Sequence, residues 1–243
     1  MDTSGILKLL QTGTVEPQGL LPWSSNYSYL VHVHGAQESV TAVYKPRRGE
    51  RPLWDFPTGT LCQREVAAYQ VSDSLSWHLV PPTVLRRGPQ GIGSVQYFIP
   101  HDPECHYFTV EGSADFRRAL QQIVLFDIII NNADRKGGHV LIEESEDARP
   151  SNRLWTIDHG ICFHEEYKLR TVIWEFAGQP IPGDLLADLT QFQARLHGDH
   201  FPNLQKFLSS AELLALEKRL DSIIRAGKFL QPGPGRHYPW PPV

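Results

Sequence analysis

The sequence predicts an α+β protein whose first part is small and rich in strands and whose second part is larger and mostly helical. The first hundred residues contain short runs of β-branched and aromatic residues separated by turn-forming segments, the pattern of strands joined in hairpins. After Pro100 the apolar residues recur with a period of about 3.6, as in helices that bury one face. We therefore expect a small unit over residues 1–100, a larger unit over residues 101–228 and a Pro/Gly-rich tail over residues 229–243 that is extended or disordered.

Three strands and one helix are predicted in the first part. The first two strands flank Gly35 and form a hairpin. The helix begins at Thr60, with Gln63 as the partner in a capping box, and continues to Ser74. The strands are expected over residues 27–34, 39–44 and 94–99.

The second part begins with a helix that Ser113 is expected to cap and that ends at Ile130. A polar loop, NNADRKGGH, follows over residues 131–139. We expect Asp127, on the buried face of the preceding helix, to cap this loop or to hydrogen-bond its backbone. The remaining elements are strands over residues 140–143 and 154–157 and helices over residues 184–197 and 210–226, the last with a capping box of Ser209 and Glu212 and with Gly227 as its C-cap.

Composition and charge exclude several classes of protein. Hydrophobic residues make up 41% and charged residues 21% of the 243 residues, which is ordinary for a globular domain and excludes a disordered, fibrous or coiled-coil chain. The formal net charge of −4 argues against a dedicated nucleic-acid binder, so no nucleic-acid partner is expected. The cysteines are few and widely spaced, which predicts reduced thiols and a cytoplasmic location; they are Cys62, Cys105 and Cys162.

No targeting or membrane-spanning segment is expected. Residues 1–13 lack the basic and apolar regions of a signal peptide. The longest apolar run, residues 123–130, is interrupted by Asp127 and is much shorter than the roughly 20 residues that cross a bilayer.

Four charged residues occur in an order that suggests a chemistry. Lys45 ends a predicted strand, and Glu65 lies in the predicted helix that follows. Asp134 lies in the polar loop, directly after a buried helix. Asp158 ends a predicted strand in the segment TIDHG, where Gly160 permits a sharp turn.

Phosphoryl transfer from ATP requires this set of residues. Because the reaction makes little covalent demand on the protein, catalysis is mostly positioning and charge neutralisation. A lysine must reach the phosphates, and a helix carboxylate must hold that lysine. One aspartate must accept or orient the proton of the acceptor hydroxyl, and another carboxylate must hold the divalent metal. Since strand side chains alternate, Val43 shares a face with Lys45 and is expected beside the nucleotide base.

Two segments also resemble a known family. NNADRKGGHVLI and WTIDHGICF resemble the catalytic loop and the metal-binding segment of the atypical kinases related to phosphatidylinositol 3- and 4-kinases. Small bacterial phosphatidylinositol kinase-like proteins look most similar, and HipA-type kinases are more distant. The resemblance covers residues 19–176 and implies a bilobal protein-kinase-like fold, with ATP and Mg²⁺ or Mn²⁺ bound between a small β-rich lobe and a larger helical lobe.

By position, the resemblance assigns roles to individual residues. It makes Asp134 the catalytic aspartate, Asp158 the metal-binding aspartate, Lys45 the phosphate-binding lysine and Glu65 its helix partner. Arg135 belongs to the same loop motif; it either binds a phosphate or pairs with Asp158 or a backbone carbonyl, and we include it among the catalytic residues. Further nucleotide contacts are implied from the loop over the phosphates, at Ser24, Ser25 and Asn26, and from the hinge that presents backbone groups to adenine, at Gln96, Tyr97 and Phe98.

The sequence departs from the family pattern in two places. The family has an asparagine five residues after the catalytic aspartate, as a second metal ligand, and this chain has His139 there. Imidazole suits softer ions than Mg²⁺, so use of Mn²⁺ or of a single metal is open. There is also no G-x-G-x-x-G segment over the phosphates. An alternative is therefore a pseudokinase-like nucleotide-binding or interaction module without transfer activity.

Simpler roles and other functions stay open at this point. Taken singly, Lys45 suits a solvated strand and Glu65 an exposed helix face, so the prediction depends on all four charged residues together. A metal-dependent hydrolase would use His32, His34 and His139, although the sequence has neither an H-E-x-x-H nor a G-x-S-x-G motif.

The acceptor is not specified by the sequence beyond being a hydroxyl. Lipid kinases of the family read anionic headgroups with basic residues after the metal-binding segment. Here that region, HEEYKLR, offers Lys168 and Arg170 but also two glutamates. The acceptor hydroxyl of a protein, a lipid or a small molecule is therefore open.

Overall fold

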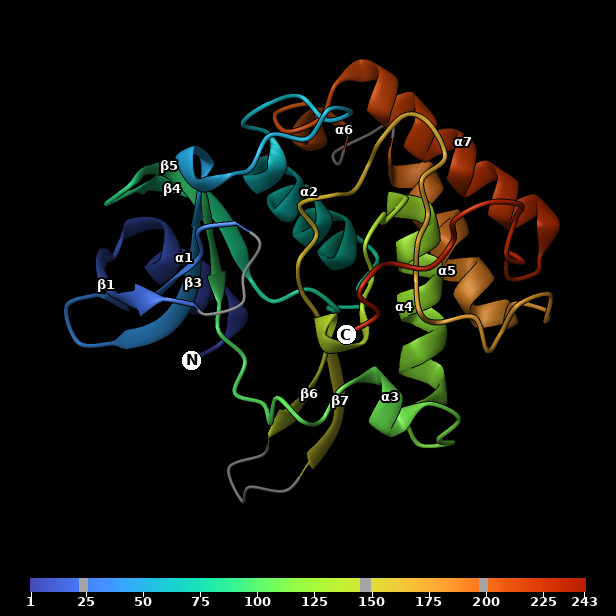
Figure 1. Ribbon diagram of the computed structural model, residues 1–243, viewed down its shortest axis with the longest axis horizontal. Helices are drawn as coiled ribbons and strands as arrows, with labels where there is room; N and C mark the ends of the chain where they lie inside the picture. The colour runs from blue at the N-terminus through green and yellow to red at the C-terminus, as the bar shows by residue number, and fades with distance from the viewer. Residues whose placement is uncertain (22–25, 145–149, 197–200) are drawn as a thin grey trace.

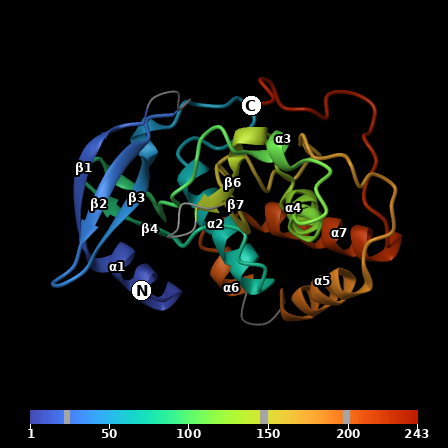
Figure 2. The same ribbon diagram turned by 90° about the horizontal axis from the view of Figure 1, so that it is seen from below.

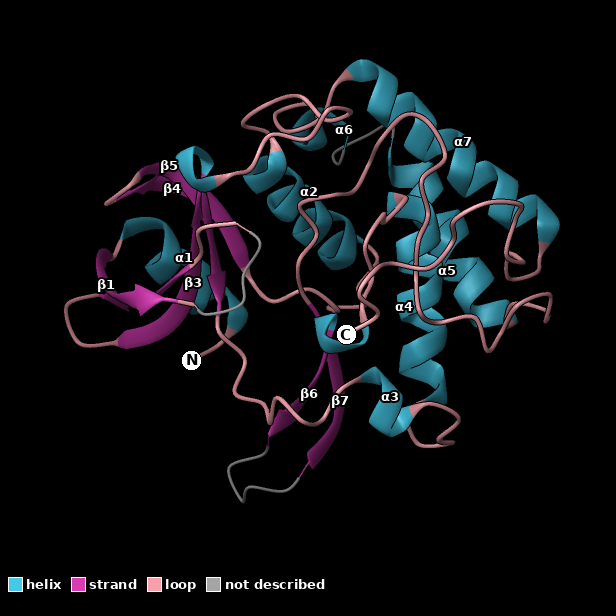
Figure 3. Ribbon diagram, viewed as in Figure 1, coloured by secondary structure: helices cyan, strands magenta, loops and turns pink. Residues whose placement is uncertain are grey.

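The computed structural model describes residues 1–21, 26–144, 150–196 and 201–243. An antiparallel sheet forms one end of the molecule and a group of helices forms the other, with one helix between them (Figures 1 and 3). This arrangement confirms the predicted α+β, two-lobed architecture. In the described ranges, no helix has the length and apolar character needed to cross a bilayer.

The small lobe consists of a five-stranded sheet and one helix. The strand order is β1-β2-β3-β5-β4 and every neighbouring pair is antiparallel. Helix α1 covers one face of the sheet (Figure 2). The elements are α1 (Thr3–Thr12), β1 (Thr14–Leu20), β2 (Tyr29–His34), β3 (Ser39–Pro46), β4 (Thr83–Gly88) and β5 (Gly91–Tyr97).

The predicted hairpin is confirmed as β2 and β3, and its register positions the predicted lysine. Lys45 pairs with Ser94 and Val43 pairs with Gln96 across β3 and β5. Gly93, one residue before Ser94, is required for this approach, because a β-carbon there would lie 2.4 Å from the carbonyl oxygen of Lys45.

Helix α1 and strand β1 were not predicted. Strand β1 is largely exposed, contains Pro17, and shifts register between Pro17 and Gly19, so it lacks the alternating pattern of a half-buried strand. The small-lobe core explains why α1 forms, since Leu9 and Leu10 pack with Val33 and other buried strand residues.

Helix α2 (Leu61–Ser74) lies between the sheet and the helices of the large lobe (Figure 1). It begins where predicted, but the capping box of Thr60 and Gln63 is wrong. The Thr60 hydroxyl donates to the carbonyl of Pro57. The carboxylate of Glu50 instead accepts from the backbone N–H groups of Leu61 and Cys62, at 3.2 and 2.9 Å.

The large lobe is built around helix α4, which packs against α7 and the β6–β7 hairpin. Its hairpin is antiparallel, as predicted. The elements are α3 (Tyr107–Val110), α4 (Arg117–Ile130), β6 (Val140–Glu144), β7 (Pro150–Thr156), α5 (Gly183–Arg195), α6 (Phe201–Leu204) and α7 (Ser210–Ala226), with short 3₁₀ turns η1 (Arg47–Gly49) and η2 (Gly137–His139).

One predicted cap in the large lobe is wrong and one is confirmed. Helix α4 starts at Arg117 and not after Ser113, whose N–H donates to the carbonyl of Val110 in the turn that closes α3. At α7, the N–H of Ser209 donates to the Glu212 carboxylate at 2.8 Å and Ser209 Oγ accepts from the N–H of Glu212 at 3.3 Å.

The Pro/Gly-rich tail contains no helix or strand, as predicted, but it packs against the large lobe. The carbonyl of His237 accepts from the N–H of Thr171 at 3.1 Å, and the carbonyl of Pro242 accepts from the N–H of Gly137 at 2.7 Å. Figure 1 shows the end of the chain over η2, next to α3. The predicted free thiols agree with the structure, in which all three cysteines are unpaired.

Candidate active site

A cavity of about 550 Å³ lies between the sheet and the loops of the large lobe. Its size is within the range of small-molecule and cofactor sites. Ser24 and Ser25, which were predicted to cover the phosphates, fall outside the described residues. The other predicted nucleotide and metal residues line the cavity, and so does the predicted catalytic aspartate: Asn26, Val43, Lys45, Glu65, Gln96, Tyr97, Phe98, Asp134, His139 and Asp158.

The predicted lysine and two of the predicted carboxylates form one cluster. Lys45 Nζ donates to Glu65 Oε1 at 2.5 Å and to Asp158 Oδ1 at 2.9 Å. The second oxygen of Glu65 accepts from the N–H of His159 at 3.0 Å. Glu65 thus joins the end of β3 to the backbone beside Asp158.

The charges in this cluster stabilise one another. Burial alone would lower the pKa of Lys45, but the neighbouring charges of Asp158 and Glu65 outweigh it and raise the pKa above its ordinary 10.5. The ammonium of Lys45 in turn holds the pKa of Asp158 well below 3.8. At neutral pH the site therefore contains a fixed cation between two carboxylates.

Asp158 has an uncommon backbone conformation, which follows from its place in the chain. Its φ is 60°, in the left-handed region that Asp and Asn tolerate better than other non-glycine residues. The turn follows directly after the segment that pairs with β6, so it directs the carboxylate out of the hairpin and into the cavity.

Asp134 has the properties of a residue that exchanges a proton near neutral pH. Burial raises its pKa to about 6, and the negative charge of Asp158 adds to this while Lys136 opposes it. Lys136 Nζ lies 3.6 Å from Asp134 Oδ2. The N–H of Asp134 donates to Asn132 Oδ1 at 3.0 Å, which fixes the turn that presents the side chain to the cavity.

His139 faces the same space as Asp158. Its Nδ1 lies 3.0 Å from the carbonyl oxygen of Asp134 and 3.5 Å from the backbone nitrogen of Lys136. The closer contact, with an oxygen that only accepts, favours a proton on Nδ1. Burial lowers the pKa of His139 to about 4, so the ring is neutral at pH 7. The unprotonated Nε2 then points at Asp158 Oδ2, 3.4 Å away. A lone pair and a carboxylate oxygen at this separation can both ligate a divalent cation.

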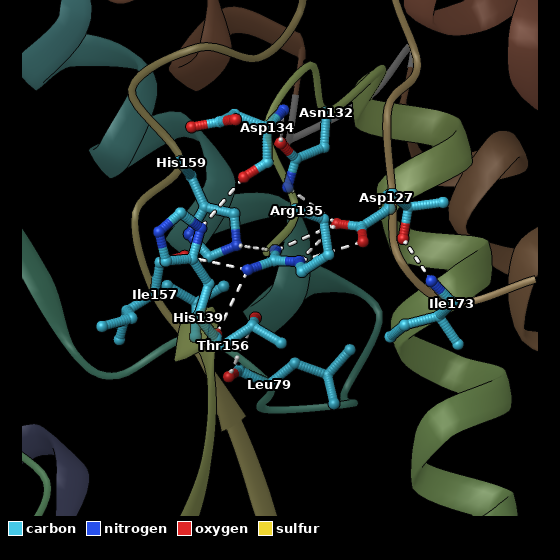
Figure 4. Close-up of polar contacts among 12 residues, drawn as sticks. Leu79, Asp127, Asn132, Asp134, Arg135, His139, Thr156, Ile157, His159 and Ile173 are labelled. Atoms are coloured by element: carbon cyan, nitrogen blue, oxygen red, sulfur yellow. Dashed lines mark hydrogen bonds and ion pairs between the residues drawn. The ribbon is translucent and has the colours of Figure 1, made fainter. Parts of the chain in front are cut away.

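Arg135 lies behind the site and does not line the cavity. Its side chain is completely buried and pairs with Asp127 on α4 through bonds of 2.9 to 3.2 Å (Figure 4). It also donates to the carbonyl of Ile157 at 2.9 Å and contacts His159 Nε2 at 2.7 Å. This placement corrects the predicted catalytic role: Arg135 ties the loop of Asp134 to the segment of Asp158.

The polar contacts in Figure 4 also show how Asp127 holds the loop. Its carboxylate binds the side chains of Asn132 and Arg135, while its backbone carbonyl accepts from the N–H of Asn132. The loop is thus held by α4 as expected, although the carboxylate reaches side chains and not the loop backbone.

Asn131 holds the other side of the loop and was not predicted. It ends α4 in the left-handed conformation, and its side chain donates to the carbonyls of His164 and Glu166 and accepts from the N–H of Lys168. Asparagine directly after a long apolar helix was the available signal, because this residue type favours left-handed helix ends.

The hinge segment, predicted at Gln96, Tyr97 and Phe98 to present backbone groups to adenine, is only partly as predicted. Tyr97 and Phe98 line the cavity, but their backbone N–H groups donate to the carbonyls of Pro82 and Thr41 within the small lobe. Those two groups are therefore committed and do not face a nucleotide. Leu141 and Ile157 were not predicted and add apolar surface to the lining of the cavity, as Val43 does. Strand alternation in the run VLIE would have placed Leu141 on the face opposite its neighbours.

The histidines proposed for a hydrolase do not come together. His139 lines the cavity, whereas His32 and His34 lie on β2 and His34 pairs with Glu16 at 3.1 Å. Across the part of the chain that the structure describes, no three His, Cys, Asp or Glu side chains are grouped to hold a metal ion.

Comparison with known proteins gives related sequences. The sequence pattern of the family described as phosphatidylinositol 3- and 4-kinase matches residues 84–194. The protein Rv2133c of Mycobacterium tuberculosis is 35% identical, over 96% of this chain and 94% of its own. Phosphatidylinositol 4-kinase gamma 4 of rice is 32% identical, over 46% of this chain but only 22% of the plant protein.

Solved structures show the same fold at low sequence identity. The Golgi casein kinase with Mn and ADP bound has a TM-score of 0.62 at 15% identity, covering 92% of this chain and 75% of that one. The Helicobacter pylori proinflammatory kinase CtkA has a TM-score of 0.55 at 13% identity, covering 90% and 94%. These likenesses show a kinase-like fold. Together with the matched family pattern and the related sequences, they establish that this chain belongs to the atypical kinases related to phosphatidylinositol 3- and 4-kinases.

Proposed function

We propose that this protein is a metal-dependent phosphotransferase that moves the γ-phosphate of ATP to a hydroxyl acceptor. The observation that carries the proposal is the position of Lys45 Nζ, which bonds to both Glu65 and Asp158 inside a cavity that Asp134 also lines. These are the phosphate-binding, metal-binding and proton-accepting groups that the reaction needs.

The nucleotide base would bind between the two lobes. Val43 on the sheet and Leu141 and Ile157 on the hairpin side provide apolar surfaces for a flat ring, and Tyr97 and Phe98 close the hinge end. The likeness to a kinase solved with Mn and ADP supports a nucleotide in this position. Lys45 would then donate to the phosphates.

The residues present fit a divalent metal that ATP helps to hold. Asp158 stays ionised, because Lys45 holds its pKa low, and the neutral His139 directs an unprotonated nitrogen toward the same point. Two protein ligands leave coordination positions for phosphate oxygens and water. When bound, the metal would neutralise charge on the phosphates. An imidazole ligand favours Mn²⁺ over Mg²⁺ more than an asparagine would.

Asp134 would act on the acceptor. Its carboxylate would take the hydroxyl proton or orient it toward the transferred phosphate, and a pKa of about 6 keeps it ionised at pH 7 while leaving it able to accept a proton. Lys136, 3.6 Å away, would stabilise the ionised form. Arg135 would position the loop without touching the substrate.

The acceptor class that the structure favours is not a lipid headgroup. Lys168, one of the two basic residues after the metal-binding segment, is largely buried and pairs with Asp55 at 2.9 Å. It is therefore already neutralised. A hydroxyl of a protein or of a small molecule is the better candidate, in the cytoplasm, where the free cysteines remain reduced.

The direct test is ATP consumption by the purified protein with Mg²⁺ and with Mn²⁺. Wild type is compared with Asp134→Asn and Asp158→Asn, and with Asp115→Asn as a matched control in an exposed turn. We expect each active-site change to lower turnover by at least about a hundredfold, and the control to match wild type. Equal turnover in all four proteins would refute the proposal.

A nucleotide-binding module without transfer activity is the second candidate. The observation that favours it is His139 at the position where the family has an asparagine ligand. Thermal shift with ATP and metal should show stabilisation for both functions, so the turnover measured beside it separates them: only the enzyme predicts turnover. His139→Asn adds a further comparison, since it should shift metal preference toward Mg²⁺ if this residue is a ligand.

A further inference from the structure

We propose that Arg64 is a positioning residue that locks helix α2 in the orientation that pairs Glu65 with Lys45. The inference builds on the proposed function, since it concerns how the same site is kept assembled. Arg64 is not one of the four charged residues Lys45, Glu65, Asp134 and Asp158, and it does not line the cavity.

The side chain of Arg64 is 1% exposed and reaches across to the large lobe. One terminal nitrogen donates to the carbonyl of Cys162 at 2.7 Å, and the other donates to Glu212 Oε1 at 2.5 Å. Its guanidinium also stacks over the ring of Phe56, 4.8 Å from the centroid. A buried guanidinium with two fixed acceptors and an aromatic face has one orientation available to it.

Each of these partners belongs to a fixed part of the fold. Glu212 is held by the capping box at the start of α7, where its other oxygen accepts from the N–H of Ser209. Cys162 lies four residues after Asp158 and is completely buried. Arg64 therefore ties α2 to α7 and to the segment that carries Asp158 at the same time.

The helix geometry transfers this restraint to Glu65. Neighbouring residues on an α-helix project about 100° apart around its axis. When Arg64 points to the large lobe, Glu65 is directed to Lys45 and to the N–H of His159. Rotation or outward movement of α2 that separated Glu65 from Lys45 would therefore also disrupt both Arg64 bonds.

The packing of helix α2 agrees with a role of Arg64 in holding the helix against the large lobe. Ala67, Ala68 and Val71, on the buried side of the helix, belong to the same hydrophobic core as α4 and α7. In protein kinases the corresponding lysine–glutamate pair is made or broken by movement of a helix under the control of phosphorylation. Here residues of the helix lie in the large-lobe core, and the pair is formed in this structure.

The test is a double-mutant cycle between Arg64→Gln and Glu65→Gln with two measurements. The first is kcat/KM for ATP. The second is the acylation rate of Lys45 by an amine-reactive reagent, followed by peptide mass spectrometry, which needs no enzymatic activity. Because the Lys45 amine is held between two carboxylates, releasing it from Glu65 should make it more available to the reagent and accelerate its labelling.

If Arg64 acts through Glu65, Arg64→Gln alone lowers kcat/KM by about tenfold or more and accelerates Lys45 labelling. In the Glu65→Gln background the same substitution changes both quantities by less than about twofold, since the pair is already broken. Equal effects of Arg64→Gln in the two backgrounds would overturn the inference. Wild type without turnover would defeat the proposed function, and the labelling cycle would still decide the role of Arg64.

Two further variants separate positioning from general loss of stability. Arg64→Lys keeps a positive charge beside Glu212 and replaces Arg64→Gln if that variant does not fold. Its rate of Lys45 labelling should lie between the rates of wild type and Arg64→Gln. Arg86→Gln is the matched control, because Arg86 donates to the backbone carbonyls of Leu10, Gly13 and Arg87, away from the cavity. It should lower the melting temperature and leave Lys45 labelling unchanged.

Discussion

Replacement of Asp134 by asparagine should make the protein more stable while it removes the proposed proton acceptor. Burial raises the pKa of this carboxyl from its ordinary 3.8 to about 6. Ionising it in the folded protein therefore costs more than ionising it in the unfolded chain, by about 3 kcal/mol at 1.36 kcal/mol per pKa unit. Asparagine has a similar shape and no charge, so it avoids this cost.

The sign of the pH dependence follows from the direction of the shift. A folded pKa above the unfolded one means that the carboxyl favours folding below about pH 4 and loses that contribution as the pH rises through about 6. The advantage of Asp134→Asn should thus be about half as large at pH 5 as at pH 7.5. For a chain of this size, about 3 kcal/mol corresponds to a melting temperature about 6 to 12 °C higher.

The assay is chemical or thermal unfolding of the metal-free protein at pH 5 and pH 7.5, with Asp115→Asn as the exposed control. Asp134→Asn should gain stability over wild type at both values and more at the higher one, and the control should gain nothing. A variant that is no more stable than wild type, or equally stabilised at both pH values, would contradict a buried and destabilised carboxylate.

One pH profile and three further substitutions also have expected outcomes. The pH profile of kcat/KM should fall about tenfold per pH unit below a midpoint near 6, where Asp134 gains its proton; a flat profile from pH 5 to 8 would exclude it as the base. Lys45→Met should lower kcat/KM for ATP by about a hundredfold or more and, because it leaves Glu65 buried without its cation, should lower the free energy of unfolding by about 3 kcal/mol. Asp158→Asn should abolish turnover yet retain a higher melting temperature than Asp158→Val, since only asparagine tolerates a φ of 60°. Asp2→Ala removes the cap that accepts from Gly5 N–H and should cost about 1 kcal/mol in unfolding experiments, with no change in turnover.

The residues of the central cluster were predictable because each is tied to a local pattern. Strand alternation placed Val43 and Lys45 on one face, and turn signals placed Asp134 and Asp158 at the ends of a helix and a strand. The structure brings these residues to one cavity. Such patterns are read from neighbours in the chain, and the family resemblance supplied the order that connects them.

Interactions between distant segments were not predictable in the same way. Arg64 pairs with Glu212, which is 148 residues away, and donates to the carbonyl of Cys162, which is 98 residues away. Nothing in the sequence distinguishes such a buried arginine from an exposed one. The N-terminus of α2 is a further case, because the local Thr60 cap loses to Glu50, which reaches the helix end from a preceding turn.

Strand β1, at the edge of the small-lobe sheet, was not predicted for a different reason. Strand β1 is exposed along most of its length and contains Pro17, so it is stabilised by pairing with β2 and not by an apolar face of its own. Periodicity detects burial, and an edge strand with little burial gives no periodic signal.

The path of the last residues has a practical consequence for work on this protein. The carbonyl of Pro242 is bonded to Gly137, and Val243 would contact a side chain placed at Gly138, which lines the cavity beside Asp134. A purification tag or fluorescent fusion added after Val243 would begin close to Gly138, at the cavity in which we propose that the acceptor binds, and is expected to disturb rates measured with it. Attached ahead of Met1, which precedes α1 against the small-lobe sheet (Figure 2), the same tag would lie away from Gly138.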